Sequence, residues 1–134
     1  MLRTSLKRLS ILLTIIAMLS LTGCRSYASH YNTTMCVYTN DSDSASLSFS
    51  TFEGTKSSKL NSKESGNSLK YTGKLGKGAA TIYYDDDGTR KELFTIKGGE
   101  TVDSKIEGLD KGKLYIIFES DGKCEEGSFK FELE

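Results

Sequence analysis

The sequence contains no proline, no tryptophan and a single histidine, His30, among its 134 residues. His30 falls in a polar N-terminal stretch, so the part expected to fold lacks the histidine that a Ser-His-Asp or Cys-His catalytic site requires. A zinc site would lack its commonest nitrogen ligand. No acidic residue lies in an apolar setting that would raise a carboxyl pKa for acid catalysis; Asp85, Asp86, Asp87, Glu125 and Glu126 all lie beside turns. We therefore expect that the protein is not an enzyme and holds no metal or other cofactor.

The sequence also lacks an excess of charge of either sign, with 18 Lys and Arg residues against 18 Asp and Glu residues. Three of the basic residues and none of the acidic ones lie in residues 1–23, which leaves the remainder at about 15 − 18 = −3. Proteins that grip nucleic-acid phosphates need clustered Lys and Arg, so we do not expect a nucleic-acid partner. The Asp-rich segments 41–43 and 85–88 do not match a calcium loop with its distal Glu, and we interpret them as solvated turns.

The apolar run near the N-terminus, residues 9–21, is too short to be a permanent membrane span. It has roughly thirteen residues, whereas a helix that crosses a bilayer needs about 20. Arg3, Lys7 and Arg8 precede it and form a positive n-region. This arrangement predicts a cleaved secretory signal peptide.

The leader ends in Leu-Thr-Gly-Cys at residues 21–24, which resembles the lipobox of bacterial prolipoproteins. The resemblance implies that residues 1–23 are removed as a lipoprotein signal peptide. Cys24 then carries a diacylglyceryl group that anchors the protein to a cell membrane on the extracytoplasmic side. Each buried CH₂ contributes about 0.8 kcal/mol, so two acyl chains anchor a protein stably. The alternative is ordinary secretion with cleavage after Ala28, which would discard Cys24.

Three cysteines fit an exported protein. If Cys24 is acylated, Cys36 and Cys124 remain as a pair in a compartment that permits disulfides. Their bridge would close a loop of nearly ninety residues, for which chain entropy gives about 4–5 kcal/mol of stabilisation. We expect this disulfide, with two reduced thiols as the alternative. Residues 24–34 are interpreted as the lipidated cysteine and a polar spacer that lifts the folded domain off the membrane.

The remaining chain, residues 35–134, is β in character. Ala45, Leu47 and Phe49 alternate with serines, and the same period of two recurs toward the C-terminus, which indicates half-buried strands. The Ser- and Lys-rich residues 54–68 are predicted to form a mobile loop. Further turns are predicted at residues 76–78, 85–88, 97–99, 108–112 and 120–123. The pattern predicts an all-β fold, a single antiparallel β-sandwich of jelly-roll type with seven or eight strands.

Residues 108–133 combine a Leu-x-x-Gly-x-x-Tyr turn and strand with a glycine hairpin and a Gly-x-Phe-x-Phe strand. This stretch looks like the end of bacterial jelly-roll modules such as the pre-peptidase C-terminal and galactose-binding-like sandwiches. The resemblance implies adhesion, carbohydrate contact or an accessory role. We therefore expect a non-catalytic binding module, attached to the membrane by its lipid, with a carbohydrate or an envelope protein as partner.

Two tyrosines, Tyr83 and Tyr115, are candidates for stacking on a sugar, because they lie on strand faces opposite the predicted core. Packing within a second sheet is the alternative for both. A protective inhibitor of a cell-wall-degrading enzyme is an alternative function, since small lysozyme-inhibitor lipoproteins share this architecture. Residues 54–68 would be the loop that reaches the enzyme. An accessory subunit of an envelope complex is a third possibility.

Overall fold

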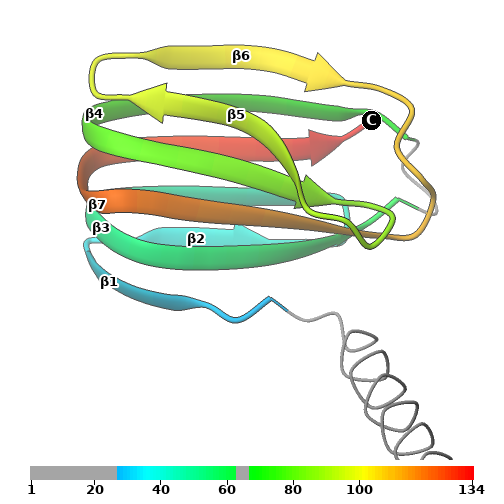
Figure 1. Cartoon of the computed structure of the whole chain (residues 1–134), viewed down its shortest axis with the longest axis horizontal. Helices are drawn as coiled ribbons and strands as arrows, with labels where there is room; N and C mark the ends of the chain where they lie inside the picture. Colours follow the sequence, from blue (N-terminus) through cyan, green and yellow to red (C-terminus); the bar gives the residue numbers. More distant parts are fainter. Residues whose placement is uncertain (1–26, 63–66) are drawn as a thin grey trace, which may run out of the picture.

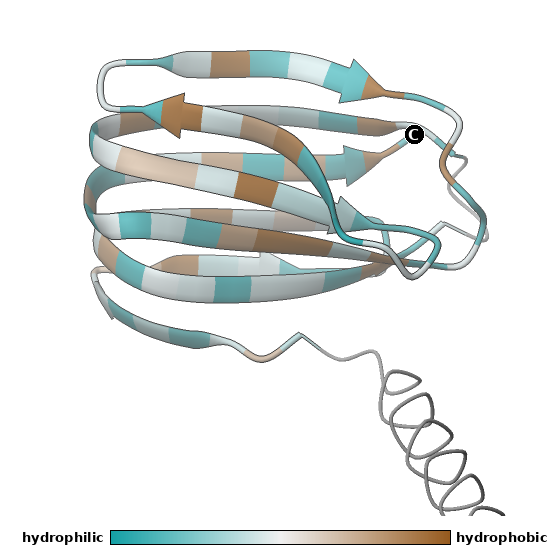
Figure 2. Cartoon of the chain, in the orientation of Figure 1, coloured by the Kyte–Doolittle hydropathy of each residue, from teal (hydrophilic) through white to brown (hydrophobic). Residues whose placement is uncertain are grey.

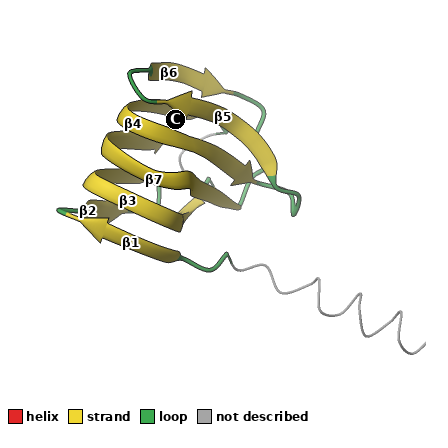
Figure 3. Cartoon of the chain, turned by 60° about the vertical axis from the view of Figure 1, so that its left-hand side comes forward, coloured by secondary structure: helices red, strands yellow, loops and turns green. Residues whose placement is uncertain are grey.

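The computed structural model describes residues 27–62 and 67–134, so the predicted signal peptide and Cys24 lie outside the described part. Its regular elements are the strands β1 (His30–Thr34), β2 (Val37–Asn40), β3 (Ser44–Asn61), β4 (Leu69–Asp85), β5 (Lys91–Lys97), β6 (Thr101–Ile106) and β7 (Lys113–Leu133). Figure 3 shows strands and loops over the described residues. No helix within the described residues is long and apolar enough to cross a membrane.

The seven strands form one antiparallel sheet in the order β1-β3-β7-β4-β5, to which β2 adds by pairing with β3 and β6 by pairing with β4. Strands β3, β4 and β7 are 18, 17 and 21 residues long. Each of them bends midway, so that the sheet folds over itself into two layers (Figure 1). The first layer contains β2, β6 and residues 44–52, 69–77 and 124–133. The second contains β5 and residues 55–61, 79–85 and 113–121. The predicted all-β sandwich is confirmed.

Glycines that the sequence analysis assigns to a loop or to turns mark the bends of the long strands instead. Gly54, Gly78 and Gly122 have φ angles of 130°, 96° and 70°. The pairing register shifts beside the first two, which is the signature of a β-bulge. The predicted turns at residues 76–78 and 120–123 are therefore wrong, because β4 and β7 continue through them.

The predicted mobile loop at residues 54–68 is also wrong over its first half. Residues 55–61 belong to β3 and pair with β7 from Thr55 opposite Glu119 to Asn61 opposite Lys113. Their serines and lysines bury little apolar area, but the ladder of backbone hydrogen bonds orders the segment nevertheless. Residues 63–66 lie outside the described part.

The core fills the space between the two layers and follows the predicted period of two. Ala45, Leu47 and Phe49 are buried on the inner face of β3, and the intervening serines face outward. Phe118 of the second layer packs on Phe129 of the first, with ring centroids 4.9 Å apart. Alternating hydrophobic and hydrophilic bands along the strands show the same pattern in Figure 2.

The expected spacer differs from the structure, because its last five residues, 30–34, are part of the sheet as β1. β1 pairs with the bend of β3, from His30 opposite Thr55 to Thr34 opposite Thr51. His30 is thus an exposed strand residue instead of a tether residue. The folded part begins before residue 35, the boundary that the sequence analysis sets.

The expected bond between Cys36 and Cys124 is absent from the structure, in which both are free thiols. Cys36 connects β1 and β2, which both pair with β3 on the side away from β7. Cys124 is on β7 and therefore lies two strand spacings from Cys36, about 9–10 Å. The Cα atoms of two cysteines joined by a disulfide are usually less than about 7 Å apart. The Cys124 thiol points toward β4 and donates to the Ala79 carbonyl, with 3.1 Å between the heavy atoms. Its burial raises the pKa of this thiol.

Candidate binding face

The outer surface of the second layer, here called the tyrosine face, brings together the two tyrosines that the sequence analysis singles out. Tyr83 in β4 lies opposite Ile117 in β7, and Tyr115 in β7 lies opposite Asp85 in β4. Because outward residues alternate along a strand, these pairings make the two tyrosines diagonal neighbours on one face. Both are half-buried.

A third tyrosine, Tyr27, lies on the same face and comes from the N-terminal segment. Its ring packs edge-on against Tyr115, with the centroids 5.4 Å apart. Ser57 of β3 holds this segment in place through two hydrogen bonds. Its hydroxyl donates to the Tyr27 carbonyl at 2.7 Å, and its N–H donates to the Ser29 hydroxyl at 3.0 Å. Tyr27 is not among the residues predicted for this face, because its one signal in the sequence is an aromatic ring close behind Cys24.

Asp85 is the buried polar group of this face, with 2% of its surface exposed. One carboxylate oxygen accepts the Tyr27 hydroxyl at 2.7 Å, and the other accepts the Gly88 N–H at 2.6 Å. A buried carboxylate needs such donors, because removing it from water is costly. Asp85 is therefore not the solvated turn residue that the sequence analysis describes. It ties the start of the β4–β5 turn to the N-terminal segment.

Arg90 and Glu119 border the other side of the tyrosine face. The Arg90 guanidinium carbon lies 4.0 Å from the centre of the Tyr83 ring, and one guanidinium nitrogen lies 3.3 Å from a Glu119 carboxylate oxygen. Aromatic rings lie here beside a cation, carboxylates and hydroxyls such as that of Thr81. Small-molecule and glycan sites combine flat apolar surface with a few polar groups in this way. The arrangement can bind a polar ligand with flat apolar faces.

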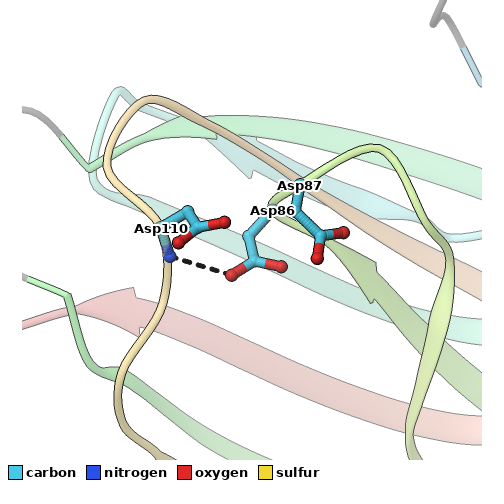
Figure 4. Close-up of side chains that lie close together, drawn as sticks. All are labelled: Asp86, Asp87 and Asp110. Carbon is cyan, nitrogen blue, oxygen red and sulfur yellow. Dashed lines mark hydrogen bonds between the residues drawn. The ribbon is translucent and has the colours of Figure 1, made fainter.

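Three carboxylates gather beside the face, at the end of the sandwich where the β4–β5 turn meets the β6–β7 loop. Asp86, Asp87 and Asp110 each offer an oxygen within 4.8 Å of the others (Figure 4). The Asp110 N–H donates to Asp86 at 2.9 Å and so joins the two loops. Asp110 comes from a distant part of the sequence, and no local signal predicts this contact.

A lysine ammonium group already occupies the space between two of these carboxylates. The Lys91 amine lies 3.2 Å from an oxygen of Asp86 and 3.0 Å from an oxygen of Asp87. Its hydrogen bonds to Asp87 and Asp86 raise the pKa of Lys91. The same bond from Lys91 and one from the Thr89 N–H lower the pKa of Asp87. The cluster is a clasp between two loops in which Lys91 offsets part of the negative charge of the three carboxylates, and a divalent cation would have to displace Lys91 to bind there.

No protein-family model and no curated protein matches the sequence. Among solved structures, a family 29 carbohydrate-binding module is similar at a TM-score of 0.41 and 20% identity, over 80% of this chain and 72% of that one. A family 61 carbohydrate-binding module in complex with β-1,4-galactotriose is similar at 0.44 and 12%, over 78% and 86%. A periplasmic inhibitor of g-type lysozyme from Aeromonas hydrophila is similar at 0.43 and 16%, over 69% and 88%. With TM-scores below 0.5, none of these likenesses bears on what this chain binds.

Proposed function

We propose that the chain is an extracytoplasmic lipoprotein, anchored to a cell membrane through Cys24, whose β-sandwich is a non-catalytic module that binds a carbohydrate. The proposal joins two parts, the anchor and the binding face. Each part has its own support and its own test.

The contacts of Tyr27 support cleavage before Cys24 over cleavage after Ala28. Cleavage after Ala28 would remove Tyr27 and with it a hydrogen bond to the buried carboxylate of Asp85. A buried acceptor that loses its partner costs about 1–3 kcal/mol, and more when it is charged. Cleavage before Cys24 retains Tyr27 and all of these contacts. These contacts therefore support a mature chain that retains Tyr27, which cleavage before Cys24 would leave in place.

The same contacts hold the tyrosine face close to the proposed anchor. Tyr27 follows Cys24 by three positions in the sequence, a span of at most about 10 Å even when fully extended. The module therefore sits directly on the membrane in this proposal, without the spacer that the sequence predicts. Its ligand would be a glycan that lies near the bilayer surface.

The observation that carries the binding proposal is the gathering of Tyr27, Tyr83 and Tyr115 on one outer sheet face. Tyrosine rings outside a core supply flat apolar area for a sugar ring, and the hydroxyl, carboxylate and guanidinium groups beside them supply hydrogen bonds. No catalytic step is required of this arrangement.

The test is binding of the detergent-solubilised full chain to an array of defined glycans. We expect Tyr83→Ala to weaken binding by at least about 1 kcal/mol, roughly fivefold. Tyr31→Ala is the matched control, because Tyr31 lies on β1 away from this face and should bind as the parent does. Equal losses in both variants, or no glycan binding by the parent chain, would exclude the tyrosine face as a carbohydrate site.

A protein partner in the envelope is a second candidate, favoured by one observation. Met35 and Val37 are 83% and 64% exposed where β1 leads into β2, and Tyr31 on β1 is 40% exposed. Exposed apolar side chains at a sheet edge are typical of protein contacts. Crosslinking from residue 37 in intact cells tests this candidate, and a reproducible single partner would support it. The inhibitor alternative loses its main argument, because much of the predicted reaching loop belongs to β3.

A further inference from the structure

The outer side of β1 and β2, here called the β1–β2 edge (residues 30–40), is a free edge of the sheet (Figure 1). Both strands pair with β3 on one side, and nothing else in the described residues pairs with the other side. An edge strand directs alternate N–H and C=O groups away from its own sheet, where another strand can pair with them. The β1–β2 edge therefore offers hydrogen bonds that this fold does not use.

The β1–β2 edge lacks the charged side chains that usually keep sheet edges apart. Residues 30–40 contain no Lys, Arg, Asp or Glu. The strands at the opposite edge, β5 and β6, do carry such charges: Lys91, Glu92, Lys97, Asp103 and Lys105. The protection against edge-to-edge pairing is thus present on one side of the sandwich and missing on the other.

Exposed apolar side chains are concentrated on the same edge. The large apolar residues that are exposed within residues 27–62 and 67–134 are Tyr31, Met35 and Val37, and all three lie on it. Met35 also has a φ of 49°, in the left-handed region that is unusual for a long side chain. A backbone that holds a long apolar side chain out into solvent is expected where that side chain contacts a partner.

A second copy of the chain fits this edge, because the edge is complementary to itself. Two copies related by a two-fold axis bring the same strand together in antiparallel directions, and an uncharged edge meets its own copy without repulsion. With the axis at Val37, the two Val37 side chains are direct cross-strand neighbours. Met35 of each copy then takes the register position opposite Thr39 of the other.

The proposed lipid anchor favours the same partner. β1 begins at His30, six positions after Cys24, which is at most about 21 Å of extended chain. Copies anchored in one membrane present this edge at the same height above the bilayer. Restricting them to the membrane plane also raises their effective concentration, so a weak contact suffices.

We propose that the β1–β2 edge pairs with the same edge of a second copy, so that the two sheets continue across a homodimer. This inference names the partner for the second candidate function and rests on that candidate, and it is independent of the tyrosine face. Contact through one sheet edge belongs to the small, transient class of interfaces. We therefore expect a dissociation constant of roughly 10–100 µM for the chain in solution.

The experiment is sedimentation equilibrium of the full chain in density-matched detergent over a range of protein concentrations. Val37→Lys places two like charges opposite each other at the axis and should weaken the dimer at least about tenfold. Thr101→Lys is the matched control, because Thr101 is an exposed residue of the other edge, on β6. It should dimerise as the parent does, and circular dichroism checks that both variants are folded.

A crosslinking experiment tests the register. Directly opposite residues in an antiparallel pair have Cα atoms about 4.5–5.5 Å apart, which is within disulfide range. In a Cys36→Ser background, Val37→Cys should therefore form a peptide that is disulfide-linked to its own copy at residue 37, with oxygen and copper phenanthroline as the oxidant. Thr101→Cys in the same background should form no such peptide.

The dimer is overturned if the parent stays monomeric up to about 1 mM, which is tenfold above the weakest dissociation constant expected. It is also overturned if Val37→Lys dimerises as tightly as the parent, or if Val37→Cys and Thr101→Cys crosslink alike. A monomeric parent that crosslinks from residue 37 to a different protein in intact cells overturns the dimer and leaves the second candidate function standing. Val37→Lys should bind the glycan array as the parent does, so neither result affects the tyrosine face.

Discussion

Replacing Tyr27 with phenylalanine removes the hydroxyl that donates to Asp85 and leaves a ring that can still pack on Tyr115. The donor and acceptor oxygens are 2.7 Å apart, and the carboxylate is 2% exposed, so water cannot easily replace the lost donor. Hydrogen bonds to charged groups contribute about 1.5–3 kcal/mol. We expect Tyr27→Phe to lower the free energy of unfolding by this amount, and the melting temperature by at least about 6 °C.

The assay is urea unfolding of the full chain in detergent, followed by circular dichroism with the parent chain in parallel. Tyr31→Phe is the matched control, since Tyr31 stacks on Phe52 and its hydroxyl makes no hydrogen bond to a residue in the described ranges. Its free energy of unfolding should stay within about 0.5 kcal/mol of the parent. If both variants unfold at the same urea concentration, the contact between Tyr27 and Asp85 does not stabilise the fold. The argument for a mature chain that includes Tyr27 then fails.

Three other predictions concern the bend, the thiols and the acidic turn. Gly54→Ala should cost at least about 3 kcal/mol of stability in denaturant titrations, because the φ of 130° disfavours a side chain and the new Cβ would clash with the backbone carbonyl oxygen of His30. A maleimide should label Cys36 in the native protein and Cys124 only after unfolding; recovery of both in one disulfide-linked peptide would contradict this. The pKa of Asp87 in the folded protein lies below its ordinary 3.8. The stability that Asp87 contributes is therefore fully present above pH 3.8 and is lost as the pH falls through the folded pKa. Lys91→Gln should raise the pKa of Asp87 in a carboxyl NMR titration, and an unchanged value would refute the clasp.

The fold class could be predicted from the sequence because alternation of apolar and polar residues is a local signal. Ala45, Leu47 and Phe49 identify a strand without reference to any partner. Strand continuity could not be predicted in the same way. A glycine such as Gly78 has the same local signature in a tight turn and in a bulge, and only the pairing of β4 with β7 on both sides distinguishes them.

The candidate site was predictable only in its strand-borne members. The alternation of apolar and polar residues predicts that Tyr83 and Tyr115 face outward from their strands. Tyr27 and Arg90 lie outside the strands, so this signal does not reach them. Their positions depend on contacts between segments far apart in the sequence, such as that between Tyr27 and Asp85, which are 58 positions apart. The disulfide prediction failed for a related reason. An even number of cysteines does not reveal that β3 lies between Cys36 and Cys124.

The mass of the N-terminal peptide, taken from protein extracted from bacterial membranes, tests the central claim most directly. The account predicts a mature chain that begins at Cys24 and carries a diacylglyceryl group, and therefore includes Tyr27 three residues later. A lipid-free chain that begins at Ser29 and is recovered from the soluble fraction would contradict it.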